Sequence, residues 1–268
     1  MVNTETINSR ENRRLVNARK VRDGKRREQI FIEGRRLAAE ALRSSIVIDE
    51  CLISDEFRDD DLLNAINDRT TNISIVANRV FKSIADTNEP QGIVLLARRP
   101  SIGVIDVQIE TAKLPLVLFL NEINNPANLG AILRSAEAAG VAGVIISANS
   151  ADVFSPRSIR GAMGSSLRLP VLENANFLEV IDWARDKRMA TIAADISAKR
   201  SYTDIDWSKP ALLIFGSEAH GLSAEQLNHV DEKISIPMEN GVESLNLGVS
   251  AGIILFEAKR QVPFNGSA

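Results

Sequence analysis

Residues 116–147 read LVLFLNEINNPANLGAILRSAEAAGVAGVIIS, in which two apolar runs flank a polar turn and a segment of helix-forming residues. Leu116–Leu120 is a continuous apolar run, as expected of a strand that is covered on both faces of a sheet. Asn128–Ala139 then predicts a helix, and Val144–Ser147 predicts the next strand. This order of elements predicts the parallel sheet of an α/β protein.

The same alternation continues towards the C-terminus. Further helices are predicted near Asn176–Arg188 and Ser223–Val230, and a last one from about Leu245. The pattern predicts a doubly wound α/β sheet, whose ligands bind outside the carboxyl ends of the strands. Short apolar runs predict the remaining strands at Leu169–Leu172, Thr191–Ala194, Leu212–Phe215 and Ile234–Pro237.

The last predicted helix carries apolar and small residues at helical spacing, which predict one stripe buried against the core. Glycine lowers helix stability, so Gly248 and Gly252 predict close packing against another backbone. The stripe consists of Leu245, Gly248, Val249, Gly252, Ile253 and Phe256.

The first hundred residues predict a second, smaller α/β domain, because short strands again alternate with helices. Pro100, near the start of the stretch Arg99–Lys113, favours a break in regular structure. The stretch is therefore predicted to be the linker. We therefore expect one domain at residues 1–105 and another at 106–268. The N-terminal strands are expected at Gln29–Glu33, Glu50–Ser54, Ile73–Ala77 and Gly92–Ala97, and the helices at Gly34–Arg43, Asp60–Asp68 and Arg79–Ile84.

The composition of the 268 residues, 44% hydrophobic and 25% charged, is typical of a globular protein of about two domains. No run of about 18 apolar residues predicts a membrane span, and the polar N-terminus shows no secretory signal. The single cysteine, Cys51, cannot form an internal disulfide, so we expect a cytoplasmic protein. Two histidines and one cysteine do not provide a zinc site of the usual spacing.

A basic segment lies between Ser9 and Arg36, where eleven Lys and Arg residues stand against four acids although the net charge of the chain is −3. Such a cluster fits either a surface that contacts nucleic-acid phosphates or a helix face exposed to solvent. No aromatic residue precedes Phe31 in it, which favours phosphate contact over base stacking. The candidate residues are Arg13, Arg14, Arg26 and Arg27.

Polar side chains follow three of the C-terminal strands. After the first, Pro126 holds Asn125 extended, and Asn128 is placed to cap the helix. Arg134 offers a rigid fork of donors that suits a phosphate. A plain helix cap remains an alternative for Asn128, and a surface salt bridge remains one for Arg134.

After Leu212–Phe215, Gly216 lets a ligand approach the backbone, and Glu218 lies at the mouth of the sheet. Ser223 predicts the cap of the next helix, with Gln226 at the capping-box position. No P-loop and no G-x-G-x-x-G fingerprint follows any strand, so nicotinamide binding has no support.

After Ile234–Pro237, Ser244 and Asn246 stand at the start of the last helix, where either can be an ordinary N-cap. In this order and spacing the three loops resemble the signature motifs of the SpoU family, within the trefoil-knotted SPOUT methyltransferases. The N-terminal domain resembles the small, ribosomal-protein L30-like substrate domain of many members. The motifs read Asn125-Pro-x-Asn128-x-Gly130-x-x-x-Arg134, then Phe215-Gly216-x-Glu218-x-x-Gly221-Leu-Ser223, then Ile236-Pro237-Met238 with Ser244-Leu-Asn246.

The resemblance implies a mostly parallel α/β methyltransferase domain that is knotted, behind a small α/β substrate-binding domain. Sequence patterns alone would not suggest a knot, because knots are very rare in proteins. The resemblance further implies an S-adenosylmethionine-dependent enzyme that methylates a ribose 2′-hydroxyl, favouring 23S ribosomal RNA as substrate. It also implies a homodimer with the active site near the dimer interface, and no metal.

By the same resemblance, Arg134 is the expected catalytic residue and engages an RNA phosphate. A guanidinium is a poor base because its pKa exceeds about 12, so orientation and charge stabilisation come first. Asn128, Glu218, Ser244 and Asn246 are expected to position Arg134, the ribose and the cofactor. The expected cofactor-binding residues are Phe215, Gly216, Ser217, Glu218, Gly221, Ile236, Met238, Ser244 and Leu245, and the expected RNA-binding residues are Arg13, Arg14, Arg26, Arg27 and Arg134.

Three other functions stay open. The protein could methylate tRNA, or be a non-catalytic RNA-binding protein of the same fold, or be a small-molecule α/β enzyme that uses another nucleotide. Arg134, Asn128 and Ser244 are all present, which favours an active enzyme over a binding protein. The missing glycine fingerprints weigh against the third function.

Overall fold

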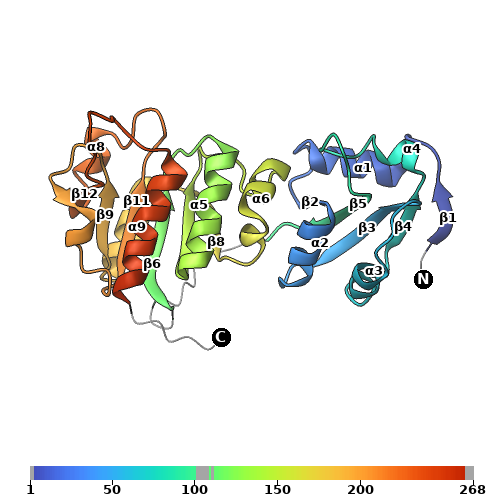
Figure 1. Ribbon diagram of the computed structural model, residues 1–268, viewed down its shortest axis with the longest axis horizontal. Coiled ribbons are helices and arrows are strands. Elements are labelled where there is room, and N and C mark those ends of the chain that lie inside the picture. The colour runs from blue at the N-terminus through green and yellow to red at the C-terminus, as the bar shows by residue number, and fades with distance from the viewer. Residues whose placement is uncertain (1–2, 101–108, 110–111, 263–268) are drawn as a thin grey trace. The chain divides into compact units, whose positions relative to one another are not determined.

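The computed structural model describes residues 3–100, 109 and 112–262, which divide into two compact units (Figure 1). Unit 1 comprises Met1–Ser101 and Val153–Arg168, and unit 2 comprises Ile102–Asp152 and Leu169–Ala268. The expected boundary at residue 105 falls outside the described residues and stays a prediction. The segment Val153–Arg168, expected in the C-terminal domain, clusters with unit 1 instead.

Unit 1 is built on a five-stranded sheet in the order β1-β4-β3-β5-β2. The β1–β4 and β3–β4 pairs are parallel, and the β3–β5 and β2–β5 pairs are antiparallel. The predicted α/β character is therefore confirmed, and β1 and α1 are additional elements. The strands are β1 (Asn3–Ile7), β2 (Gln29–Glu33), β3 (Ile48–Ser54), β4 (Ile73–Val76) and β5 (Ile93–Arg98), and the helices are α1 (Arg13–Arg22), α2 (Arg35–Leu42), α3 (Asp60–Asn67), α4 (Asn78–Phe81) and α6 (Pro156–Ala162).

Helix α1 covers the core of unit 1 with one apolar face. Leu15, Ala18 and Val21 follow one another at three-residue spacing and pack in a cluster with Phe31 and Phe81. The basic residues of the helix occupy its remaining surface, because only a narrow stripe of this arginine-rich segment is apolar. The part of the basic segment that forms α1 thus packs on the sheet of unit 1.

The segment Val153–Arg168 is held to unit 1 by ion pairs. Arg160 Nη1 lies 2.5 Å from Asp86 Oδ2, and Arg168 Nη1 lies 2.5 Å from Glu40 Oε2. Both acids belong to the N-terminal part of the unit. Unit 1 is therefore discontinuous in sequence, whereas the sequence analysis expected a single division within the linker.

Unit 2 is a seven-stranded sheet in the order β10-β12-β9-β11-β6-β7-β8, and all its strand pairs are parallel. The predicted parallel α/β sheet is confirmed. None of the described helices is long and apolar enough to span a membrane. The strands are β6 (Leu114–Leu120), β7 (Val141–Ser147), β8 (Val171–Ala175), β9 (Ala190–Ala194), β10 (Arg200–Ser201), β11 (Ala211–Phe215) and β12 (Glu232–Ser235).

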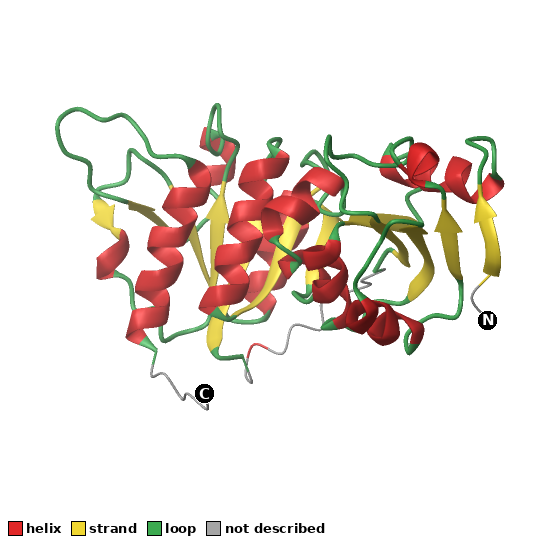
Figure 2. Cartoon of the chain, turned by 45° about the vertical axis from the view of Figure 1, so that its right-hand side comes forward, coloured by secondary structure: helices red, strands yellow, loops and turns green. Residues whose placement is uncertain are grey.

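Helices cover both faces of this sheet. Helices α5 (Pro126–Ala139) and α9 (Leu247–Gln261) lie side by side on one face (Figures 1 and 2). Helix α7 (Phe177–Asp186) covers the other face, where its apolar side packs with Val117 and Phe119 of β6. Strand side chains alternate between faces, so Leu118, which lies between these two residues, points towards α5 and α9. The short helix α8 (Ala224–Leu227) follows β11.

Helix α9 begins at Leu247, and its buried face differs from the predicted stripe. Val249 and Phe256 are 51% and 50% exposed, so the prediction of a single buried stripe was wrong at these positions. The glycine prediction is confirmed for Gly248, where an added Cβ would lie 3.2 Å from the Cβ of Ala131 in α5. The buried residues of α9 are Gly248, Ala251, Ile254, Leu255 and Ala258.

Candidate active site

A pocket of about 830 Å³ opens at the carboxyl ends of the strands of unit 2. Three loops form most of its wall: residues 194–197 after β9, 216–222 after β11 and 235–247 after β12. This is the position where doubly wound sheets bind their ligands, because successive loops converge there.

The pocket gathers most of the residues that the motifs predict. Phe215 is the exception among the expected cofactor-binding residues, because its side chain is 1% exposed within β11. Asn128 and Asn246 also line the pocket. The expected cofactor-binding residues found there are Gly216, Ser217, Glu218, Gly221, Ile236, Met238, Ser244 and Leu245.

Sequence reasoning missed the loop after β9. Asp195 and Ile196 line the pocket, and Ile196 is 73% exposed. The rule that ligands bind beyond strand ends, applied to the predicted strand Thr191–Ala194, would have pointed to them.

A chain of hydrogen bonds joins one residue from each motif. Glu218 Oε1 accepts from Asn128 Nδ2 at 3.2 Å and from the Asn125 backbone N–H at 3.3 Å, and Glu218 Oε2 accepts from the Asn124 N–H at 3.3 Å. Asn246 Nδ2 donates to Asn128 Oδ1 at 3.0 Å. We call the side chains of Glu218, Asn128 and Asn246 the motif network. They connect the start of α5 and the loop before it with the loop after β11 and the loop after β12.

Asn128 is not the helix cap that its position suggested. Asn125 caps α5 instead, accepting the Ala127 N–H at 2.9 Å. Proline is preferred at the first helical position because it has no N–H to satisfy, so Pro126 places the cap one residue before itself. Asn128 lies within the first turn, where its side chain is left for the motif network.

The two other predicted caps behave as expected. Asn246 caps α9, accepting the Gly248 N–H at 2.9 Å while its amide nitrogen serves the motif network. Ser223 and Gln226 form a reciprocal capping box at α8. Ser244 is exposed, and its hydroxyl has no hydrogen-bond partner within the described part of the chain.

Gly216 is required by the turn that follows it. A Cβ at this position would lie 2.2 Å from the carbonyl carbon of Gly221, a distance that no real structure tolerates. The turn is closed by Ser217 and Gly221, whose backbones exchange two hydrogen bonds of 3.1 and 2.9 Å. The sequence pattern predicted that a ligand would approach the backbone at Gly216. In the structure the backbone of the same loop, at Gly221 and Leu222, occupies the space where a Cβ would lie.

Arg134 lies on the exposed side of α5 and is not among the residues that line the pocket. Within the described ranges it makes no hydrogen bond or ion pair, so the alternative of a surface salt bridge finds no partner there. Its neighbours along the exposed stripe of α5 are small: Ala127, Ala131 and Ala138.

The predicted RNA-binding arginines of unit 1 fall into two groups. Arg14 donates to Asn72 Oδ1 at 2.9 Å and to Ser74 Oγ, and its Nη1 lies 3.3 Å from Glu50 Oε1. Arg26 donates to Asn17 Oδ1 at 2.8 Å. These two are engaged within their own unit, which does not support the RNA contact expected of them. Arg13 and Arg27 are exposed and have no such partner in the part of the chain that the structure describes.

Comparison with known proteins matches both units to families. The model of the SpoU rRNA Methylase family matches residues 115–256. The chain belongs to the SpoU rRNA methylase family. A second family model, the MRM3-like substrate binding domain, matches residues 11–95 of this SpoU-family protein. Both matches agree with the resemblance that the motifs carry.

Two curated relatives illustrate the family. The 23S rRNA (guanosine(2553)-2′-O)-methyltransferase RlmP of Bacillus subtilis is 28% identical over 94% of this chain and 98% of its own length. The 23S rRNA (uridine(2479)-2′-O)-methyltransferase of Streptomyces viridochromogenes is 32% identical over 72% of this chain and 68% of its own length.

Solved structures share the whole fold of the SpoU-family protein. The AdoMet-bound rRNA methyltransferase from Sinorhizobium meliloti superposes with a TM-score of 0.86 at 27% identity, over 98% of this chain and 99% of its own. The SpoU methyltransferase AviRb from Streptomyces viridochromogenes, in complex with AdoMet, gives a TM-score of 0.81 at 27% identity, over 93% and 98%. The predicted two-part α/β architecture is thereby confirmed.

Proposed function

We propose that this SpoU-family protein transfers a methyl group from S-adenosylmethionine to a ribose 2′-hydroxyl of 23S ribosomal RNA. The observation that carries the proposal is the motif network, which joins the start of α5 to the loops after β11 and β12 beside the pocket. The two curated relatives described above are named for this reaction on 23S rRNA. Of the three alternatives, tRNA methylation is the nearest, since it needs the same chemistry.

The pocket fits the cofactor. Its volume of about 830 Å³ lies within the ~300–1,000 Å³ typical of ligand sites. Ile236, Leu245 and Ile254 provide apolar wall, and polar groups of the 216–222 loop stand beside them. The cofactor supplies, when bound, a methyl group on a positively charged sulfur.

The motif network positions these loops. Glu218 accepts hydrogen bonds at both carboxylate oxygens, so we assign it the role of fixing the loop before α5 against the loop after β11. The side chain of Asn128 donates to Glu218 and accepts from Asn246. Ser244 keeps a free hydroxyl for the substrate or the cofactor. Held loops of this kind supply near-attack geometry, which is the main contribution open to a methyl-transfer site.

Arg134 is assigned to the RNA. Its exposed, unpaired guanidinium suits bidentate contact with a phosphate next to the target ribose. Such a contact orients the 2′-hydroxyl and stabilises negative charge that develops on its oxygen.

We include a homodimer in the proposal. Val249 and Phe256 of α9 are exposed, α5 exposes a stripe of alanines, and α5 and α9 are adjacent helices. An exposed apolar face of this kind is typical of a protein interface. Burial of this face in a dimer would place Arg134 at the interface.

The trefoil knot implied by the family resemblance and the cytoplasmic location expected from the sequence belong to the same proposal. Support for the knot comes from the path of the chain after β12, which passes the pocket loops before α9 packs beside α5.

Light scattering on the purified protein tests the dimer, with Phe256→Glu as the variant expected to yield monomers.

Transfer of tritium from labelled S-adenosylmethionine into total RNA tests the reaction. Wild-type protein is expected to label 23S rRNA at a 2′-O-methyl nucleotide, and Arg134→Ala is expected to lose the label while binding the cofactor normally. Label in tRNA instead would replace the substrate. No label in any RNA, with cofactor binding intact, would favour the non-catalytic binding protein.

A further inference from the structure

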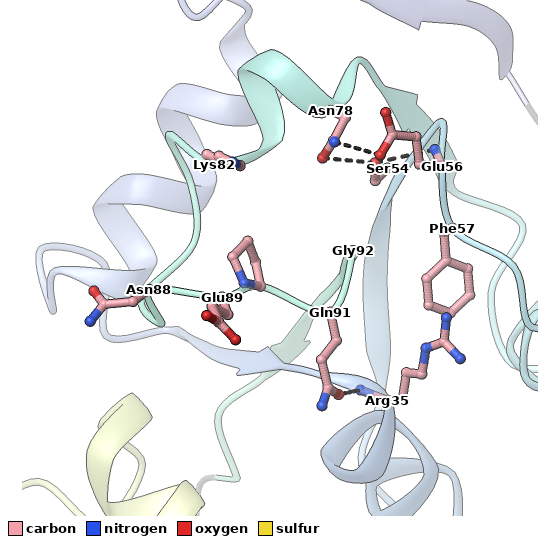
Figure 3. Close-up of a pocket in the computed structure, with 11 residues that line it drawn as sticks. Arg35, Ser54, Glu56, Phe57, Asn78, Lys82, Asn88, Glu89, Gln91 and Gly92 are labelled. Carbon is pink, nitrogen blue, oxygen red and sulfur yellow. Dashed lines mark hydrogen bonds between the residues drawn. The ribbon is translucent and has the colours of Figure 1, made fainter.

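Unit 1 contains a pocket of about 630 Å³ that takes no part in the proposed methyl transfer (Figure 3). Its walls come from the turn after β3 (residues 54–57), from Arg35 at the start of α2, and from residues 78–92, which lead from α4 into β5. These three stretches surround one open space in Figure 3.

Two glycines with left-handed backbone conformations shape this pocket. Gly34 has a φ of 99° and Gly92 has a φ of 76°. A Cβ on Gly92 would lie 3.3 Å from the Cβ of Ser54 and 3.4 Å from the Phe57 ring, and a Cβ on Gly34 would lie 3.1 Å from Gln91 Oε1. The missing side chains at both positions let the walls approach each other closely. The cavity is therefore part of the fold.

One wall of the pocket is a stacked pair. The guanidinium carbon of Arg35 lies 4.8 Å from the centre of the Phe57 ring (Figure 3). Phe57 is 6% exposed, whereas the side chain of Arg35 is 47% exposed. The guanidinium thus lies over the buried ring, with Asp59 Oδ2 3.9 Å from its Nη1, and keeps surface open to solvent. Guanidinium planes of this kind stack on the unpaired bases of RNA.

The polar groups of the pocket include both donors and acceptors. Gln91 Oε1 accepts the Arg35 backbone N–H at 2.8 Å, which directs the amide nitrogen of Gln91 elsewhere as a donor. Lys82, Asn88 and Glu89 make no hydrogen bond or ion pair with any residue that the structure describes. Donors and acceptors side by side match the edge of a nucleobase.

The charges of the pocket argue against a phosphate as the main ligand. Arg35 and Lys82 are offset by Glu56 and Glu89, which line the same space. Glu56 is already bonded by Asn78 Nδ2 at 2.6 Å, so Glu89 is the free acceptor. A carboxylate accepts from two adjacent N–H groups at once, and among the RNA bases guanine offers such a pair at N1 and its amino group.

We propose that this pocket binds one unpaired guanine nucleotide of the substrate RNA, with its base stacked on Arg35 and its N–H edge bonded by Glu89. The inference rests on the proposed function, because it takes the substrate to be RNA. It assigns unit 1 the task of selecting an unpaired base, in addition to any contact with phosphates.

Nuclear magnetic resonance of the full-length protein tests the ligand. The probes are the RNA pentamers AAGAA, AACAA, AAUAA and AAAAA, together with inorganic phosphate. We expect AAGAA to shift the backbone amides of Gly34 and Gly92 saturably, at concentrations at least fivefold lower than the other pentamers. Equal shifts from all pentamers, shifts from phosphate alone, or no saturable shift would each overturn the proposal.

Matched variants test the residues. Arg35→Ala and Glu89→Gln are expected to raise the KM for RNA at least tenfold, with unchanged affinity for S-adenosylmethionine. Lys187→Ala, at an exposed residue of unit 2 that lines neither pocket, and Glu11→Gln are the controls, expected to stay within twofold of wild type. Thermal melts confirm that each variant folds.

The outcomes separate this inference from the proposed function. If wild type methylates RNA but the pocket variants match their controls, the guanine pocket is wrong and the methyltransferase stands. If wild type transfers no methyl group, the pentamer titration still decides whether the pocket selects guanine.

Discussion

The loops around the pocket of unit 2 and the basic helix α1 of unit 1 are both rich in polar side chains, but those side chains have different partners. In unit 2, Asn246 bonds Asn128 across 118 positions of sequence, so each contact joins two loops. In unit 1, Arg14 bonds Asn72 and Ser74, which attaches the helix to β4 and the residue before it in its own sheet. Substitutions in the first region should therefore impair activity, and substitutions in the second should impair stability.

The largest effect in this comparison is expected from Gly216→Ala. The added methyl group would collide with the backbone of Gly221 and displace the whole 217–221 turn. We expect affinity for S-adenosylmethionine to fall more than a hundredfold, measured by calorimetric titration. Gly252→Ala is the control, since its Cβ would meet only Ser135 Oγ at 3.7 Å, and replacing a helical glycine adds about 0.5–1 kcal/mol of stability.

The motif network should act as one unit. Asn128→Ala and Asn246→Ala are each expected to lower kcat/KM by about 10–100-fold, which corresponds to about 1.4–2.7 kcal/mol. The double variant should lose little more, because each single change already breaks the bond between them. Additive losses in the double-mutant cycle would show that the two side chains act separately.

Arg14→Ala is expected to destabilise unit 1 by about 1–3 kcal/mol, because it leaves Glu50 as a buried carboxylate without its cation. Chemical denaturation measures the loss. Cofactor affinity should not change. An unaltered free energy of unfolding would mean that Arg14 is not structural and would return it to the candidate RNA surface.

The double variant with Arg13→Ala and Arg27→Ala should alter RNA binding and leave stability unchanged, which is the reverse of the effect expected for Arg14→Ala. Both side chains are exposed, so stability is expected to stay within about 0.5 kcal/mol. The salt dependence of RNA binding should flatten by about 0.7–0.9 in slope per arginine that contacts a phosphate. A slope equal to that of wild type would identify these residues as a solvated helix face.

The smallest effect concerns pH. Burial raises the pKa of Glu50 above its ordinary value, and the nearby Arg14 only partly opposes this. A raised pKa in the folded state means that the corresponding stability is complete below pH ~4.5 and is lost as pH rises through the folded-state pKa. Glu50→Gln should remove this part of the pH dependence, so denaturation at pH 4.5 and 7 should differ less than in wild type.

Sequence patterns predicted the elements wherever hydrophobic periodicity was strong. The strand Gln29–Glu33 was predicted at its observed bounds, and the three loops were correctly placed at strand ends. The strand Asn3–Ile7 was missed because a short polar sequence gives no apolar signal, and only its pairing with β4 defines it.

Other features could not be predicted, because they depend on partners distant in sequence. The apolar spacing of α9 cannot tell a face that packs on α5 from one left exposed, as Phe256 is. Counting charges finds Arg14 but not its bonds to Asn72 and Ser74. The motif spacing selected residues that line one pocket, whereas the hydrogen bonds between them required the folded loops.

The placement of Val153–Arg168 in unit 1 has a consequence for synthesis of the protein. The chain passes between the units three times, at residues 101–102, 152–153 and 168–169. After the last strand of unit 1 the ribosome must add roughly 70 residues before this unit is complete, which takes about 3.5–14 s at typical elongation rates of about 5–20 residues per second. During that interval Glu40 and Asp86 lack their ion-pair partners, Arg168 and Arg160. Unit 1 therefore finishes folding only after the first strands of unit 2 have been made.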